Sequence, residues 1–96
     1  MNTANLQMEG MLMAASALCR LMREKGIAEA GEIDAALAEA ERALAADRLR
    51  PEELSQSNVE AVLFPLRFLR EANRVEPSAT YTEIATSVGR TRRRTA

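Results

Sequence analysis

The residues that could carry out chemistry are few and isolated. The sequence contains no histidine, which is the commonest general base and the commonest zinc ligand in proteins. Its single cysteine, Cys19, therefore has no histidine to activate it, and it lies in an apolar run. We interpret Cys19 as a small hydrophobic residue in a reducing compartment, and we expect neither a nucleophile nor a zinc site.

The carboxylates and glycines form no recognisable site either. Glu39 and Glu41, like Glu52 and Glu53, have the spacing of solvated helix faces, where nothing tunes a carboxylate for proton transfer. The four glycines are scattered and form no loop that could bind phosphate. We therefore predict a protein that is not an enzyme and that has no catalytic residue, cofactor or metal.

One local spacing points to a binding function. Ala85 and Gly89 have the Ala-x-x-x-Gly spacing of the first helix and turn of a helix-turn-helix unit, which this segment resembles. The cations that follow would then contact DNA phosphates: Arg90, Arg92, Arg93 and Arg94. Only seven residues follow Gly89, too few for a full recognition helix, and Arg90 and Thr95 replace expected apolar residues. DNA binding is therefore an alternative hypothesis.

The composition predicts helices as the framework for any site. Ala, Leu, Glu and Arg are abundant and favour helix, whereas Val, Ile, Tyr, Phe and Trp number only 10 of the 96 residues. Ala supplies 18 positions, so large apolar side chains are scarce. We predict a single all-α domain over residues 1–89, a small bundle of three to four helices, and a flexible Arg-rich tail over residues 90–96.

Turn and capping signals divide this domain into four predicted helices. Gly26 is placed to end the first helix in a left-handed conformation, and Gly89 to end the last. Ser57 and Thr80 each precede a Glu by three residues, the spacing of a capping box. Pro65 removes a backbone donor within the third helix and predicts a kink. The predicted helices span about residues 5–25, 29–47, 58–73 and 81–88.

The first predicted helix is apolar around nearly its whole circumference. At about 100° per residue, its apolar side chains form two faces on roughly opposite sides. One face consists of Met8, Met11, Leu12, Ala15, Leu18, Cys19 and Met22, and the other of Leu6, Met13, Ala17 and Leu21. Only a narrow arc, which includes Glu9 and Arg20, is polar. Nearly the whole surface of this helix is therefore expected to need cover from water.

The third predicted helix repeats this arrangement. One apolar side consists of Val59, Val62, Leu63, Leu66 and Leu69, and the other of Phe64, Phe68, Ala72 and Val75. Between them, Arg67 and Glu71 are four residues apart, a spacing that predicts a solvent-exposed polar seam. The second helix, by contrast, has a single apolar stripe formed by Ile33, Leu37, Ala40 and Leu44.

Two helices with double apolar faces need more cover than one short chain provides. Each Met or Leu left in water forgoes about 1.5–3 kcal/mol of burial, and several together approach the whole stability of a small domain, roughly 5–15 kcal/mol. We therefore predict that the bundle is completed by homodimerisation. The predicted interface with itself or a partner consists of Met8, Met11, Leu12, Met13, Leu18, Leu21, Met22, Phe64 and Phe68.

The leading functional hypothesis is a small homodimeric regulatory protein that docks an apolar helical face onto another protein. An adaptor, an inhibitor or an anti-activator fits this description, because helix-in-groove docking uses such faces. One alternative is a DNA-binding transcriptional regulator that uses the partial helix-turn-helix and the Arg90–Arg94 tail. The other is a non-catalytic accessory subunit of an enzyme. The expected partners are a second copy of the chain and another protein.

The sequence also carries signals for location. The apolar run Gly10–Cys19 is too short to cross a bilayer, and no Lys or Arg precedes it as in a signal peptide. Abundant Ala and Arg are typical of a GC-rich bacterial genome. We therefore expect a cytoplasmic bacterial protein without membrane contact.

Overall fold

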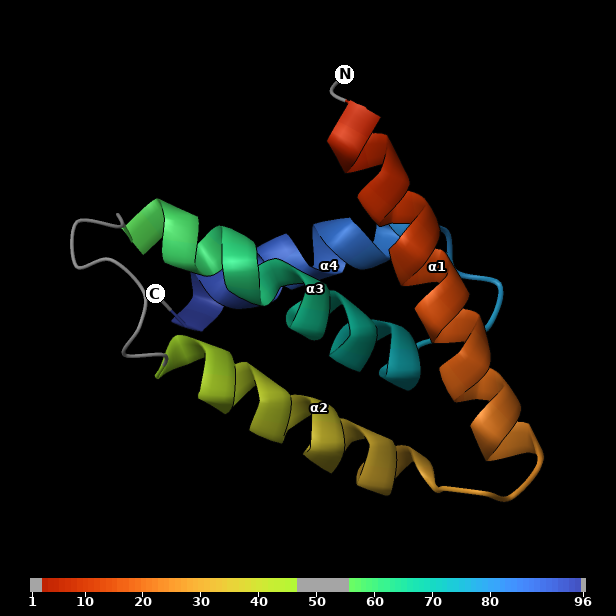
Figure 1. The fold of residues 1–96 in the computed structure, drawn as a ribbon. Coiled ribbons are helices and arrows are strands. Elements are labelled where there is room, and N and C mark those ends of the chain that lie inside the picture. The colour runs from red at the N-terminus through yellow and green to blue at the C-terminus, as the bar shows by residue number, and fades with distance from the viewer. Residues whose placement is uncertain (1–2, 47–55, 96) are drawn as a thin grey trace.

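The computed structural model describes residues 3–46 and 56–95, and these residues form an all-α fold without strands (Figure 1). The helices are α1 (Thr3–Glu24), α2 (Ala30–Ala45), α3 (Gln56–Arg74) and α4 (Tyr81–Thr95). The predicted class and the predicted number of helices are therefore confirmed. None of the described helices has the length and apolar character needed to cross a membrane.

The end of α1 follows from a glycine. Gly26 has a φ of 72°, in the left-handed region that favours glycine. This conformation lets the Gly26 N–H donate to the carbonyl of Arg23 at 3.1 Å and the Ile27 N–H donate to the carbonyl of Met22 at 2.9 Å. These two bonds form a Schellman motif, which satisfies carbonyls that the helix leaves unpaired. The prediction that Gly26 ends the first helix is confirmed.

The starts of α2 and α4 use carboxylates from the first turn. Glu32 Oε1 accepts a hydrogen bond from the backbone N–H of Glu29 at 2.9 Å. At α4, Glu83 Oε1 accepts from the Thr80 N–H at 2.8 Å, and Thr80 Oγ1 accepts from the Glu83 N–H at 3.1 Å. The reciprocal pair at α4 is the capping box that the sequence predicts.

One helix end differs from what the sequence predicts. Pro65 lies within α3, which continues through it as one helix. The helix α4 does not end at Gly89 but continues to Thr95, so the predicted end of this helix is wrong and residues 90–95 of the predicted tail are helical. Glycine within a helix costs only about 1 kcal/mol, and the buried residues Ile84 and Val88 hold this helix in place. The turn that a helix-turn-helix needs at Gly89 is therefore not formed.

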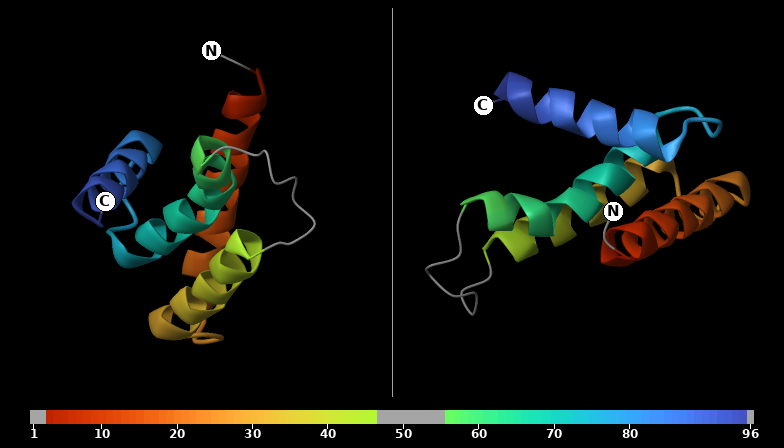
Figure 2. Two further views of the ribbon diagram at one scale, coloured as in Figure 1. Left: turned by 90° about the vertical axis from the view of Figure 1, so that its left-hand side faces the viewer. Right: turned by 90° about the horizontal axis from the view of Figure 1, so that it is seen from above.

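Helix α3 is the centre of the bundle. It contacts each of the other three helices, which lie on different sides of it (Figures 1 and 2). The core lies where α1, α3 and α4 meet, and it is built from Leu12, Phe68 and Ile84. Phe68 is fully buried, with its ring centroid 5.0 Å from that of Tyr81 and 6.0 Å from that of Phe64. Both apolar sides of α3 are therefore at least partly covered by the chain itself, and Val62, at 37%, is the most exposed of their residues.

Candidate functional site

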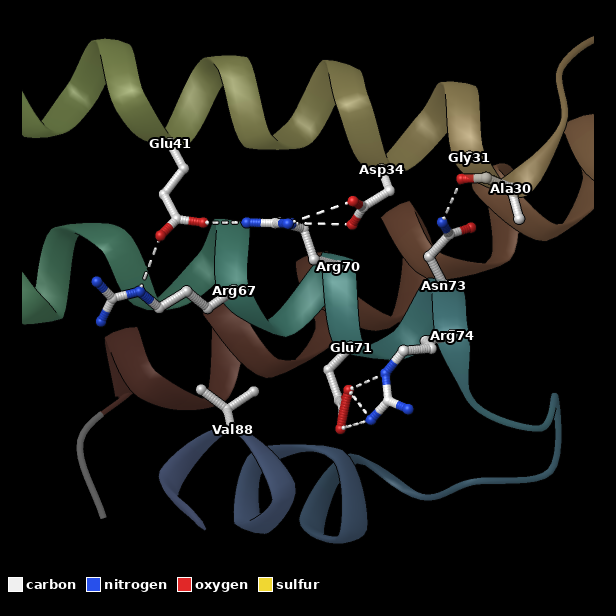
Figure 3. Close-up of a pocket in the computed structure, with 10 residues that line it drawn as sticks. All are labelled: Ala30, Gly31, Asp34, Glu41, Arg67, Arg70, Glu71, Asn73, Arg74 and Val88. Atoms are coloured by element: carbon white, nitrogen blue, oxygen red, sulfur yellow. Dashed lines mark hydrogen bonds and ion pairs between the residues drawn. The ribbon is translucent and has the colours of Figure 1, made fainter. Parts of the chain in front are cut away.

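A charged groove of about 650 Å³ lies between α2, α3 and α4 (Figure 3). Three arginines from consecutive turns of α3 line it, and each faces at least one carboxylate. The charged lining residues are Asp34, Glu41, Arg67, Arg70, Glu71 and Arg74. One ion-pair cluster lies on the α2 side of the groove and another on the α4 side. These clusters decide whether any charged side chain of the groove is left unpaired for a ligand.

The cluster between α2 and α3 is a chain of five charged residues. Arg70 donates to Asp34 through Nε at 2.9 Å and Nη2 at 3.2 Å, and through Nη1 to Glu41 at 3.1 Å. Arg67 donates to the other oxygen of Glu41 at 3.0 Å and to Glu60. The bond from Arg70 lowers the pKa of Asp34, and the bond from Asp34 in turn raises the pKa of Arg70. Both ends of this pair therefore stay ionised at neutral pH.

The second cluster joins α3 to α4. Glu71 is buried, and it accepts hydrogen bonds from Arg74 at 2.6–2.9 Å and from the hydroxyl of Ser87 on α4. Burial raises the pKa of Glu71, but the bonds from Ser87 and Arg74 together outweigh it, so the pKa lies below its ordinary value. The predicted exposed seam between Arg67 and Glu71 is wrong, because these two side chains point to different partners.

The charged side chains of the groove therefore join α3 to α2 and to α4. The arginines are neutralised by carboxylates of the same chain, and a lowered carboxyl pKa favours an ion-pair partner over a proton donor. In the described part of the chain, no group of three or more His, Cys, Asp or Glu residues could hold a metal ion. Cys19 is free and partly buried on α1.

The outer surface of α1 is the other prominent feature. Leu12 is the only buried residue of this helix, and Figures 1 and 2 show no described helix on its outer side. The residues on the side of α1 opposite Leu12 are all exposed, and we call this set of residues the α1 arc. The α1 arc consists of Leu6, Gly10, Met11, Met13, Ala14, Ala17, Leu18, Leu21 and Met22.

The α1 arc is continuous and uncharged. On a wheel of about 100° per residue, its members cover roughly half the circumference of the helix. From Leu6 to Met22, Gln7 is the one polar residue within this half, and it carries no charge. The exposed fraction reaches 63% for Leu18 and 72% for Met11. The exposed residues of the two predicted faces thus share a single apolar surface, whereas Met8, Leu12, Ala15 and Cys19 of the first predicted face are buried or partly buried.

The structure divides the predicted interface residues into two groups. Met11, Met13, Leu18, Leu21 and Met22 are exposed on the α1 arc. The prediction does not hold in the same way for the other four residues, which point inward. Leu12 and Phe68 are buried core residues, and Met8 and Phe64 are partly buried against that core. Leu12 and Phe68 are therefore not available to a partner as the sequence predicts, and Met8 and Phe64 are available only in part.

The remaining predicted site is the Arg-rich segment. Arg90 is exposed on α4, and the side chains of Arg92, Arg93 and Arg94 lie outside the described residues. The three comparisons, with protein-family models, with curated proteins and with solved structures, find no match to this chain.

Proposed function

We propose that this chain is a non-enzymatic protein-binding module of the adaptor, inhibitor or anti-activator type, and that the α1 arc is its docking surface. The observation that carries this proposal is the continuous, uncharged and exposed apolar surface along one helix. Monomeric soluble proteins rarely expose contiguous apolar patches larger than a few hundred Å², and larger patches mark interaction sites.

The free energy available at the α1 arc is large for so small a domain. Its six large side chains are exposed by 36–72%. Burying what remains exposed would contribute roughly half of the 1.5–3 kcal/mol per full side chain, or about 5–9 kcal/mol in total. This amount is comparable to the whole stability of a small domain, about 5–15 kcal/mol. Docking onto a complementary surface therefore has a substantial driving force.

The shape of the α1 arc favours a protein partner over a small ligand. Pockets for small molecules are concave, whereas this surface is the convex side of a helix. Apolar helix faces of this kind dock into grooves or onto other helices. Methionine supplies three of the six large side chains, and its flexible thioether adapts to the surface that it meets.

A pair of matched substitutions tests this proposal. Met11→Glu places a charge in the α1 arc, whereas Ile27→Glu places the same charge at a residue of nearly equal exposure, 70%, just beyond the helix. Both variants should fold, as judged by circular dichroism. Only Met11→Glu should lose association with other polypeptides, whether with itself or with a protein captured by the wild-type chain. If Met11→Glu keeps every association of the wild type, the α1 arc is not a docking surface.

A further inference from the structure

We infer that the occupant of the α1 arc is a second copy of the same chain, with the two α1 helices antiparallel and their two-fold axis near Ala14. This inference rests on the proposed docking function and names the partner. It depends on two charged residues that flank the α1 arc, Glu9 and Arg20, and on the small residues at its centre.

Glu9 and Arg20 lie on the same rim of the α1 arc. On the helical wheel they are about 20° apart, at the border next to Met13. Glu9 has no ion-pair partner among the described residues. Arg20 has two long, exposed contacts, an ion pair with Glu24 at 3.7 Å and a hydrogen bond to the carbonyl of Pro77 at 3.4 Å. Exposed pairs of this type contribute little, so the guanidinium of Arg20 can turn to another carboxylate.

Antiparallel pairing brings these opposite charges together. When two identical helices pack antiparallel, the same rim of each copy lies beside its counterpart in the other copy. A two-fold axis between Ala14 and Ala15 then places Glu9 at the level of Arg20 of the second copy. The symmetry repeats this pair on the other half of the interface. In a parallel pair, the rim with Glu9 would meet the opposite rim, where Met8 and Ala15 offer no charge. The positions of Glu9 and Arg20 therefore select the antiparallel arrangement.

The centre of the α1 arc suits a close approach of two helices. Gly10, Ala14 and Ala17 are small and exposed, and nothing lies within 4 Å of a Cβ added at Gly10. The larger residues Met11 and Leu18 lie on either side of this centre, at equivalent levels of the two copies. Half the circumference of a helix over the length of the arc gives on the order of 1,000 Å² for both copies together, the lower bound for a specific interface. A weak dimer that forms at raised protein concentration is therefore expected.

Charge exchange at the rim tests the arrangement. In the Glu9→Arg variant, an arginine at position 9 faces Arg20 of the second copy at each end of the interface. In the Arg20→Glu variant, a glutamate at position 20 faces Glu9 of the second copy. Sedimentation velocity over a concentration series should show each single variant dimerising about fivefold to tenfold more weakly than the wild type, and the double variant should recover most of this loss. The double variant restores an opposite-charge pair between the copies but keeps every other effect of the Arg20 substitution. Recovery of dimerisation would therefore show that the pairing itself is responsible. Raising the salt concentration should shrink these differences.

Disulfide trapping gives a second readout. In a Cys19→Ala background, Ala14→Cys should form a covalent dimer, because the two copies of residue 14 meet near the axis. Leu6→Cys should not, because an antiparallel pair separates the two copies of residue 6 by about 26 Å, far beyond disulfide reach. Trapping through Leu6→Cys would overturn the antiparallel pairing.

The outcomes separate the two proposals. A wild-type chain that is monomeric at all concentrations, but that still binds another polypeptide in a way that Met11→Glu abolishes, would overturn the second copy as occupant and leave the docking function in place. Single charge variants that dimerise as well as the wild type would overturn the antiparallel arrangement. A chain without any association would overturn both.

Discussion

Arg70 on α3 forms a two-bond fork with Asp34 on α2, at 2.9 and 3.2 Å, across 36 residues of sequence. The same guanidinium also donates to Glu41, which lies about two helical turns further along α2. The helix α2 is thus held to α3 by ion pairs beside the buried Ile33, whereas α1 and α4 meet α3 through an apolar core. Figure 3 shows these ion pairs along the groove.

Replacing Arg70 tests the contribution of this fork to stability. Arg70→Gln should lower the free energy of unfolding by about 1–2 kcal/mol, because both bonds to Asp34 are lost while the pair is only partly shielded from water. Arg42→Gln is the matched control, since Arg42 is exposed on α2, the helix that Arg70 contacts. It should change the stability by less than about 0.5 kcal/mol. Urea unfolding measures both, and equal effects would contradict this role for Arg70.

The stability should fall in acid. The pKa values of Asp34 and Glu71 are lowered in the folded chain, so the folded state favours the ionised forms. Their contribution is therefore present above the ordinary carboxyl pKa and is lost as the pH falls below it, between about pH 5 and 3. Asp34→Asn should flatten this part of the profile in urea unfolding at several pH values. A profile of wild-type slope in that variant would assign the acid sensitivity to other groups.

Burial predicts very different costs for two large apolar residues. Phe68→Ala removes a fully buried ring from the junction of α1, α3 and α4, and it should cost about 3–5 kcal/mol. Leu18→Ala truncates a side chain that is 63% exposed, and in dilute solution it should cost less than about 1 kcal/mol. Thermal unfolding at low concentration measures the difference. A large cost for Leu18→Ala under those conditions would mean that α1 packs differently.

Two glycines should respond to alanine with opposite signs. Gly10 lies inside α1 with open space around an added Cβ, so Gly10→Ala should stabilise the helix by about 0.5–1 kcal/mol. Gly26 has a φ of 72°, so Gly26→Ala should destabilise the end of α1 by about 1 kcal/mol. The same sign for both substitutions in thermal unfolding would contradict the Schellman motif at Gly26.

The helices and several of their ends could be predicted from the sequence because the signals are local. Gly26 and the pair of Thr80 and Glu83 act through backbone groups only a few residues away. Gly89 shows the limit of such signals, because the burial of Ile84 and Val88 decides whether the helix continues past a glycine. Packing overrides the local preference there.

The surfaces were harder to predict because they depend on which helix occupies the centre. The apolar pattern of the sequence predicts a partner surface on α1 and on α3 alike. In the structure, however, α3 lies among the other three helices and its Phe68 is fully buried. The bonds from Arg70 to Asp34 and from Ser87 to Glu71 join different helices, so no i, i+4 spacing indicates them. The exposed side of α1, by contrast, carries the apolar surplus that the sequence indicates.

Oxidative footprinting of the methionines measures the central claim most directly. Met11 is 72% exposed on the α1 arc, whereas Met8, three residues earlier on α1, packs partly against the core and serves as the internal reference. In dilute solution Met11 should oxidise faster than Met8. As the concentration of the chain rises from low micromolar to near millimolar, Met11 should become protected while Met8 changes little. An oxidation rate of Met11 that stays constant over this range, with or without a captured partner, would contradict the account.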